Sequence, residues 1–149
     1  MKSNVNNQLT WNETKKEQLD DFMVNWGKTM RQTYTSYTPA SPGNYYGMTI
    51  PNKVFEHNLI VNDAPTTMSW YNENSQSTDK YQVVACYSDS NDQEHGAKMI
   101  HHLYLFTIVN NQPIVLITQQ SDVNSENKLY FHETNNQSLK ENFTNIIEN

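Results

Sequence analysis

The sequence is poor in cysteine, arginine, glycine and long apolar runs. The single cysteine, Cys86, excludes an intrachain disulfide framework and any zinc site built from several cysteines. Nucleic-acid phosphates are held by clustered Lys and Arg, whereas here the one arginine, Arg31, accompanies nine scattered lysines. The longest apolar-rich stretch, 103–116, is interrupted by two asparagines and a proline, and a membrane-spanning helix needs ~20 apolar residues. We therefore expect no nucleic-acid partner and no transmembrane segment in this chain.

Charged residues are also scarce, at 17% of the chain against roughly 25% in an average protein. Lys plus Arg is 10 and Asp plus Glu is 16, so the net charge is −6. Asn, Gln, Ser and Thr together make up 56 of the 149 residues. Such a surface suits neutral polar ligands, because it offers hydrogen bonds without long-range charge steering.

The length of 149 residues fits one domain with a core large enough to need no metal or disulfide. Residues 1–9 are polar and lack the apolar region of a signal peptide. We therefore expect a flexible polar leader over 1–9 and a single domain over 10–149.

A long helix is predicted at the start of this domain. Thr10 and Glu13 have the spacing of a capping box. Apolar residues then recur at steps of three and four from Leu19 to Tyr37, before prolines and a glycine end the helical region at 39–43. Gly27 inside this helix costs about 1 kcal/mol relative to alanine. We expect that another backbone approaches the helix closely at that turn.

Strands and a short second helix are predicted after it. The Asn110–Asn111 pair suits a tight hairpin, since asparagine tolerates positive φ. The strands joined there are apolar on both faces, which predicts a central position covered on both sides. The second helix, 138–147, begins with a capping box of Ser138 and Glu141. The predicted strands are 45–50, 59–61, 66–71, 81–88, 98–109, 114–120 and 128–134.

These elements predict an α+β domain. The long N-terminal helix covers one face of a curved antiparallel sheet of six or seven strands, and the short C-terminal helix helps to cover the other. By layout alone, a cystatin-like or NTF2-like arrangement is a suitable analogue.

Five segments carry a resemblance to a known family: 22–34 (FMVNWGKTMRQTY) followed by 37–39 (YTP), 84–89 (VACYSD), 102–108 (HLYLFTI), 113–120 (PIVLITQQ), and 127–131 (NKLYF) with 133–134 (ET). Together, and in order, they resemble an uncharacterised domain family of secreted lipoproteins from low-GC Gram-positive bacteria, mainly lactobacilli and their relatives. The resemblance covers most of the chain from about Trp11 onward.

The resemblance implies an extracellular domain, tethered to the membrane through an N-terminal lipidated cysteine. It implies no activity, because the family is a domain of unknown function, and no catalytic residue is carried over. The chain departs from the pattern by lacking the signal and the lipid-bearing cysteine. Either Met1 stands downstream of both, which we favour, or this member is not exported.

Several residues could carry chemistry. His95, His101 and His102 suggest a metal or an acid–base site, but neighbouring strand residues point to opposite faces, so partly buried histidines bonded to backbone carbonyls are favoured. Cys86 lies in a predicted strand without a local cation or helix N-terminus, which favours a buried structural thiol over a nucleophile. We therefore expect no catalytic residue, no metal and no cofactor.

Two acidic segments are candidates for a calcium-binding loop. Asp122, Asn124 and Glu126 nearly match the ligand spacing, but the loop lacks the usual glycine and joins predicted strands. A polar hairpin loop is therefore favoured. The second group, at Asp89, Asp92 and Glu94, lacks the spacing and is interpreted as a solvated turn.

Aromatic residues are the remaining candidates for a binding site, since Tyr and Trp offer a flat apolar face with a polar end. The predicted ligand-binding residues are Tyr45, Tyr46, Trp70, Tyr71, His102 and Tyr104.

Two functions stay open at this point. The first is a non-catalytic binding or interaction domain, with cell-wall material or a small polar ligand as partner. The second is a small hydrolase, which requires two or more of five residues to meet in one pocket: His57, His101, His102, His132 and Glu133.

Overall fold

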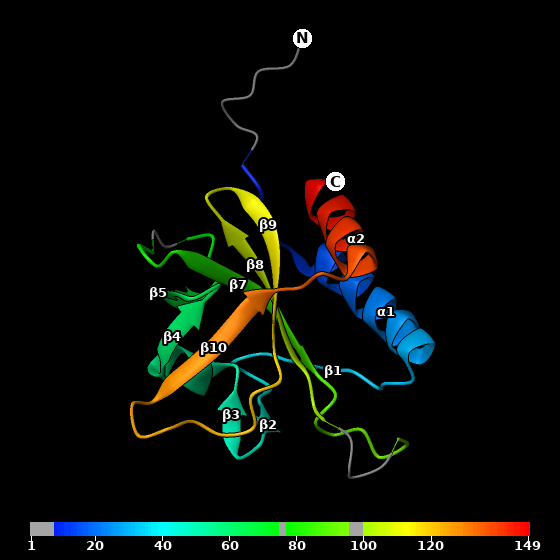
Figure 1. Ribbon diagram of the computed structural model, residues 1–149. Coiled ribbons are helices and arrows are strands. Elements are labelled where there is room, and N and C mark those ends of the chain that lie inside the picture. Colours follow the sequence, from blue (N-terminus) through cyan, green and yellow to red (C-terminus); the bar gives the residue numbers. More distant parts are fainter. Residues whose placement is uncertain (1–7, 75–76, 96–99) are drawn as a thin grey trace.

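The computed structural model describes residues 8–74, 77–95 and 100–149. Most of the expected leader, and Lys98 and Met99 of an expected strand, lie outside the described residues. The elements are α1 (Glu13–Met30), β1 (Thr35–Tyr37), β2 (Gly43–Tyr45), β3 (Met48–Ile50), the 3-10 helix η1 (Asn52–Glu56), β4 (Asn58–Val61), β5 (Ala64–Thr66), β6 (Met68–Trp70), β7 (Tyr81–Ser88), β8 (Leu103–Val109), β9 (Gln112–Thr118), β10 (Lys128–Glu133) and α2 (Gln137–Glu148) (Figure 1).

One mostly antiparallel sheet organises the chain, which confirms the α+β class. Its strands follow the order β1-β7-β8-β9-β10-β4-β5, and β6 shares the outer edge of β7 with β1. Two pairs, β10 with β4 and β6 with β7, are parallel. Strands β2 and β3 form a separate hairpin.

The β8–β9 hairpin lies in the middle of the sheet, as its apolar sequence predicts. Every residue of β8 is buried. Asn110 and Asn111 form the turn with φ of 49° and 60°, a conformation that asparagine tolerates better than most residues. Leu103 pairs with Thr118 at the far end of the ladder, so the predicted hairpin is confirmed.

Two hydrophobic cores lie on opposite faces of this sheet. On one face, Leu19 and Met23 of α1 and Leu139 and Phe143 of α2 share one core with Phe106 of β8. Both helices lie on the same side of the sheet (Figure 1) and contact each other. The expectation that the C-terminal helix covers the other face is therefore wrong.

The other face is covered by the sheet itself and by the segments between β1 and β6. Residues of β4 and β10, such as Leu59 and Phe131, share one core with Cys86 and Leu105 of the central strands. Side chains of β4 and β10 reach those of β7 and β8 because the sheet curves strongly. The β2–β3 hairpin and η1 add Tyr45 and Val54 to this core. This face of the sheet is therefore covered without α1 or α2.

Helix α1 begins and ends at different residues from those expected. Its N-cap is Asn12, whose side chain accepts a hydrogen bond of 2.8 Å from the backbone of Lys15, rather than Thr10. It ends at Met30, so Tyr34 and Tyr37 lie beyond it. Helix α2 is likewise capped by Asn136, two residues before the expected Ser138.

Gly27 lies where the chain folds back after α1. Arg31 takes the left-handed conformation with φ of 57°, and Gln32 then donates a backbone hydrogen bond of 2.8 Å to the carbonyl of Gly27. A Cβ at residue 27 would lie 2.5 Å from the Gln32 carbonyl oxygen. The close backbone approach expected from the sequence is confirmed, and it comes from the turn that follows the helix.

Candidate functional site

The predicted binding residues divide among three places. Tyr45 and Tyr46 line a cleft beside the β2–β3 hairpin. Trp70 and Tyr71 line a smaller hollow at the N-terminal end of α1, together with Trp11. His102 lines a third cavity, and Tyr104 is buried in a cluster of aromatic rings with Trp26 and Tyr34. The six residues therefore form no common site.

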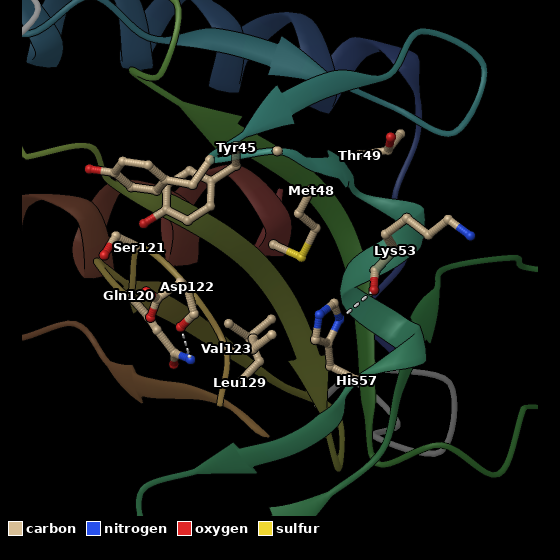
Figure 2. Close-up of a pocket in the computed structure, with 12 residues that line it drawn as sticks. Tyr45, Met48, Thr49, Lys53, His57, Gln120, Ser121, Asp122, Val123 and Leu129 are labelled. Atoms are coloured by element: carbon tan, nitrogen blue, oxygen red, sulfur yellow. Dashed lines mark hydrogen bonds between the residues drawn. The ribbon is translucent and has the colours of Figure 1, made fainter. Parts of the chain in front are cut away.

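The cleft at Tyr45 and Tyr46 has a volume of about 490 Å³. It lies between the β2–β3 hairpin, η1 and the loop 119–127 that joins β9 to β10 (Figure 2). Met48, Val123 and Leu129 give it an apolar lining (Figure 2).

The turn between β2 and β3 places the two tyrosines. Tyr46 and Gly47 have φ of 49° and 88°, which is typical of a two-residue hairpin loop but unusual for a tyrosine. The ring of Tyr45 is buried, and its hydroxyl lies 3.4 Å from the backbone oxygens of His101 and Thr118. Tyr46, by contrast, is 41% exposed. A bulky side chain held in a strained conformation at a cleft is a feature of functional sites.

His101 contacts the exposed ring of Tyr46 in two ways. Its backbone N–H donates a hydrogen bond of 3.0 Å to the Tyr46 hydroxyl, and its imidazole lies 5.0 Å from the Tyr46 ring, centre to centre. Tyr45 packs edge-on against the same ring at 4.8 Å. Tyr46 is therefore fixed at the cleft before any ligand arrives.

The opposite wall is a loop stabilised by one amide side chain. Gln120 donates to the carbonyls of Asp122 and Lys128 at 2.7 and 2.9 Å and accepts from the backbone of Tyr130 at 2.9 Å. The loop joins the antiparallel strands β9 and β10, so the polar hairpin loop expected at Asp122 is confirmed. In the described parts of the chain, no three His, Cys, Asp or Glu side chains are grouped to hold a metal.

No acid–base pair was found among the described residues that line this cleft. His57 bonds the carbonyl of Lys53 through Nδ1 at 2.7 Å. The Lys53 amine pairs with Glu56 at 3.1 Å, and Figure 2 shows the amine directed away from Tyr45. The arrangement can bind a small molecule by contact and stacking, but it brings no nucleophile and base together.

The five residues of the hydrolase hypothesis lie with different partners. His57 bonds Lys53, His101 packs on Tyr46, and His102 bonds Asp89. His132 bonds the backbone oxygen of its neighbour Glu133, whose carboxylate lies 3.8 Å from the Lys140 amine. Within the described residues, none of these five side chains bonds another, so the geometry that the hypothesis requires is not formed.

Two aspartate–histidine pairs are the feature that sequence reasoning missed. Asp89 bonds Nδ1 of His102 at 2.8 Å, and Asp92 bonds Nδ1 of His95 at 2.7 Å. Both carboxylates are fully buried, so the interpretation of this segment as a solvated turn is wrong for them and right for the exposed Glu94.

The partners of these histidines also differ from the expected backbone carbonyls. The three-residue spacing of Asp92 and His95 was the available signal for one pair. The partner of Asp89 lies 13 residues away, beyond any local pattern. Nδ1 of His101 is buried and has no hydrogen-bond partner among the residues that the structure describes.

Cys86 is a structural thiol, as expected. It has no exposed surface and lies in the core formed by the curved sheet. Burial raises the pKa of this thiol well above its ordinary value, which keeps it protonated and unreactive.

Comparisons with known proteins give a family but no activity. No curated protein matches the chain, and no solved structure matches it, so the cystatin-like or NTF2-like layout stays a prediction. In the part of the chain that the structure describes, no helix is both long and apolar enough to cross a membrane. Residues 8–147 match the model of the family described as Domain of unknown function (DUF4767). The chain therefore belongs to this uncharacterised family.

Proposed function

We propose that this domain is a non-catalytic binding module displayed outside the cell, and that its ligand site is the cleft between the β2–β3 hairpin and the loop 119–127. The observation that carries the proposal is the fixed, exposed ring of Tyr46 at the edge of a cleft of about 490 Å³. Pockets of this size that are mainly apolar, with a few polar groups, are typical of small-molecule sites.

The lining determines the class of ligand. Met48, Val123 and Leu129 offer apolar contact, and Tyr46 offers a flat ring with a hydroxyl at its end. His57 has Nε2 left for a ligand, since its Nδ1 is bonded to Lys53. A neutral ring with polar substituents, such as a sugar unit of cell-wall material, matches these surfaces. The net charge of −6 favours neutral over anionic wall polymers.

Replacing Tyr46 with asparagine tests the cleft. Asparagine tolerates the positive φ of this position, so the hairpin is kept while the ring is removed. We expect the dissociation constant for purified peptidoglycan, measured by co-sedimentation, to rise about two- to tenfold, since an aromatic contact contributes ~0.5–1.5 kcal/mol.

Tyr130→Asn is the matched control. Tyr130 is 46% exposed, close to the 41% of Tyr46, and does not line the cleft. Its replacement should leave co-sedimentation unchanged. The proposal fails if the unaltered protein does not co-sediment, or if both variants lose binding equally.

The extracellular location rests on different support. The resemblance to secreted lipoproteins of Gram-positive bacteria and the amide-rich, weakly charged composition both favour export. We expect protease added to intact native cells to remove the domain in an immunoblot while a cytoplasmic marker is retained. Protection of the domain until the cells are lysed would contradict this part of the proposal.

A further inference from the structure

The cavity lined by His102, of about 740 Å³, lies between the end of α1 and the described parts of the β7–β8 connection, at 94–95 and 100–102. The segment 101–102 separates it from the cleft, because His101 faces Tyr46 and His102 lines this cavity. Its polar lining consists of Arg31, Gln32, Glu94, His95, His102 and Gln119. None of these residues takes part in the proposed cleft.

The two histidines are oriented alike by buried carboxylates. Each imidazole bonds an aspartate through Nδ1, at 2.7 Å for His95 and 2.8 Å for His102. The aspartates are themselves fixed, since Asp92 accepts three backbone hydrogen bonds and Asp89 accepts one from the backbone of His102. A histidine held through Nδ1 in this way presents Nε2 in a defined direction.

The other polar groups supply donors. Arg31 is the only arginine of the chain, and its guanidinium makes no ion pair within the described residues. The Gln32 oxygen already accepts a hydrogen bond of 2.6 Å from the Tyr34 hydroxyl, so its NH₂ group is the part left to bond a ligand. Gln119 is exposed at the same cavity.

We propose that this cavity binds an oxyanion, a carboxylate or phosphate-type group, held by Arg31 and by the Nε2–H groups of His95 and His102. Guanidinium and imidazolium groups donate charge-assisted hydrogen bonds to such anions. The resulting site is separate from the cleft, so it stands or falls independently of the proposed function.

The surrounding charges agree with an anion more than with a metal. Arg31 repels a cation, and among the described residues no three His, Cys, Asp or Glu side chains are grouped closely enough to hold a metal. Glu94 is the one carboxylate among the described residues that line the cavity, and it is exposed and can turn to solvent. Asp89 and Asp92 lie buried behind the imidazoles.

Two phenols complete the surroundings. Tyr104 stacks on His102 with ring centres 6.4 Å apart, and Tyr34 packs on Tyr104. Burial raises the pKa of Tyr104 to about 12, and burial likewise raises the pKa of Tyr34. Both phenols therefore stay neutral in the range where histidine titrates.

Anion binding and metal binding at this cavity would change with pH in opposite directions. Imidazole side chains in general gain their second proton between pH 8 and pH 5, and an Nε2–H donor exists in both histidines only when both rings are protonated. Anion binding should therefore strengthen as the pH falls. Metal binding requires a deprotonated Nε2 and would strengthen as the pH rises.

Titration with sulfate and with acetate, followed by amide NMR shifts at pH 6 and pH 8, tests the proposal. We expect at least one anion to shift the amides of residues 31–33, 94–95 and 102, with about tenfold tighter binding at pH 6. Preference for sulfate assigns a phosphate-type ligand, and preference for acetate assigns a carboxylate. Arg31→Gln should weaken binding about tenfold, and Arg31→Lys should restore part of it.

His102→Gln should reduce the pH dependence. The control is His132→Gln, because His132 is an exposed histidine of β10 that lines neither the cleft nor this cavity; this variant should bind as the unaltered protein does. Amide shifts for Arg31→Gln that remain native outside the cavity will show that the variant is folded. The proposal is overturned if neither anion binds at pH 6, if Arg31→Gln binds unchanged, or if zinc alone binds and does so more tightly at pH 8.

Discussion

Replacing Phe143 with alanine is expected to lower the free energy of unfolding by about 3–5 kcal/mol. Phe143 has no exposed surface and lies at the junction of both helices and the sheet. Its ring is 5.1 Å from that of Phe106 and 5.9 Å from that of Trp11, centre to centre. Helix α2 has 12 residues, too few to persist without packing, so the cavity left by the ring weakens the attachment of the whole helix.

Urea denaturation followed by tryptophan fluorescence measures the change. Phe143→Leu, which keeps most of the volume, should lose less than the alanine variant. Val24→Ala, at a residue of α1 that is 49% exposed, should change the free energy by under ~0.5 kcal/mol. If Phe143→Ala unfolded at the same urea concentration as the unaltered protein, α2 would not be packed as the structure shows.

The apolar positions of both helices could be predicted from the sequence, and their ends could not. Leu139, Phe143 and Ile147 follow a helical spacing and are buried. The caps are harder, because the chain offers several side chains that can accept a backbone hydrogen bond near each helix start. In the structure Asn12, and not Thr10, caps α1. The backbone carbonyl of Thr10 instead accepts a hydrogen bond of 2.8 Å from the Lys15 amine.

The sheet face that α2 covers could not be predicted without knowing the topology of the sheet. A periodic pattern shows that a helix has one apolar face but does not say which sheet face it covers. The parallel pairing of β10 with β4 joins segments about 70 residues apart. This pairing lets the curved sheet cover its own second face, so α2 is not needed there. β1 was missed for a related reason: Tyr34 and Tyr37 continue the spacing of α1, yet Arg31 has already turned the chain.

The candidate site could be predicted only in part. Tyr45 and Tyr46 stand together in the sequence and both line the cleft, but its other wall, at Gln120 and Val123, comes from a distant loop without an aromatic residue. The prediction that Asp89 and Asp92 lie in a solvated turn was wrong, because acidic residues among polar neighbours are mostly exposed and these two are not. Asp89 and Asp92 are buried because specific donors, fixed only by the fold, surround them.

Replacing Asp92 with asparagine is expected to cost about 2–4 kcal/mol of unfolding free energy near pH 6, since hydrogen bonds to a buried charged group contribute ~1.5–3 kcal/mol each. The carboxylate accepts bonds from the backbone of Thr33, Glu94 and His95 and from the His95 ring. An amide keeps one acceptor oxygen and directs an NH₂ group at donors on the other side. The loss should also release Thr33 after α1, which faster exchange of its amide proton would report.

The change with pH in the stability lost by Asp92→Asn is a more specific test of the ionised carboxylate. Burial by itself would raise the pKa of Asp92, but the hydrogen bonds from His95 and from the backbone amides outweigh burial and lower the pKa below its ordinary value. A carboxylate whose pKa is lower in the folded state stabilises the fold above the unfolded-state pKa, and this contribution is lost as the pH falls through the folded-state pKa. The difference in unfolding free energy between the unaltered protein and Asp92→Asn should therefore be full at pH 6 and shrink below about pH 4.

Asp63→Asn is the matched control for this titration. Asp63 is exposed, and its φ of 69° is one that asparagine accepts equally well. Its replacement should change stability by less than ~0.5 kcal/mol at every pH. A cost for Asp92→Asn that stayed constant from pH 6 to pH 2.5 would mean that the ionised carboxylate does not support the fold. A cost that disappears in acid would show that the ionised Asp92 carboxylate, through its bonds to Thr33 and His95, stabilises the fold at the end of α1.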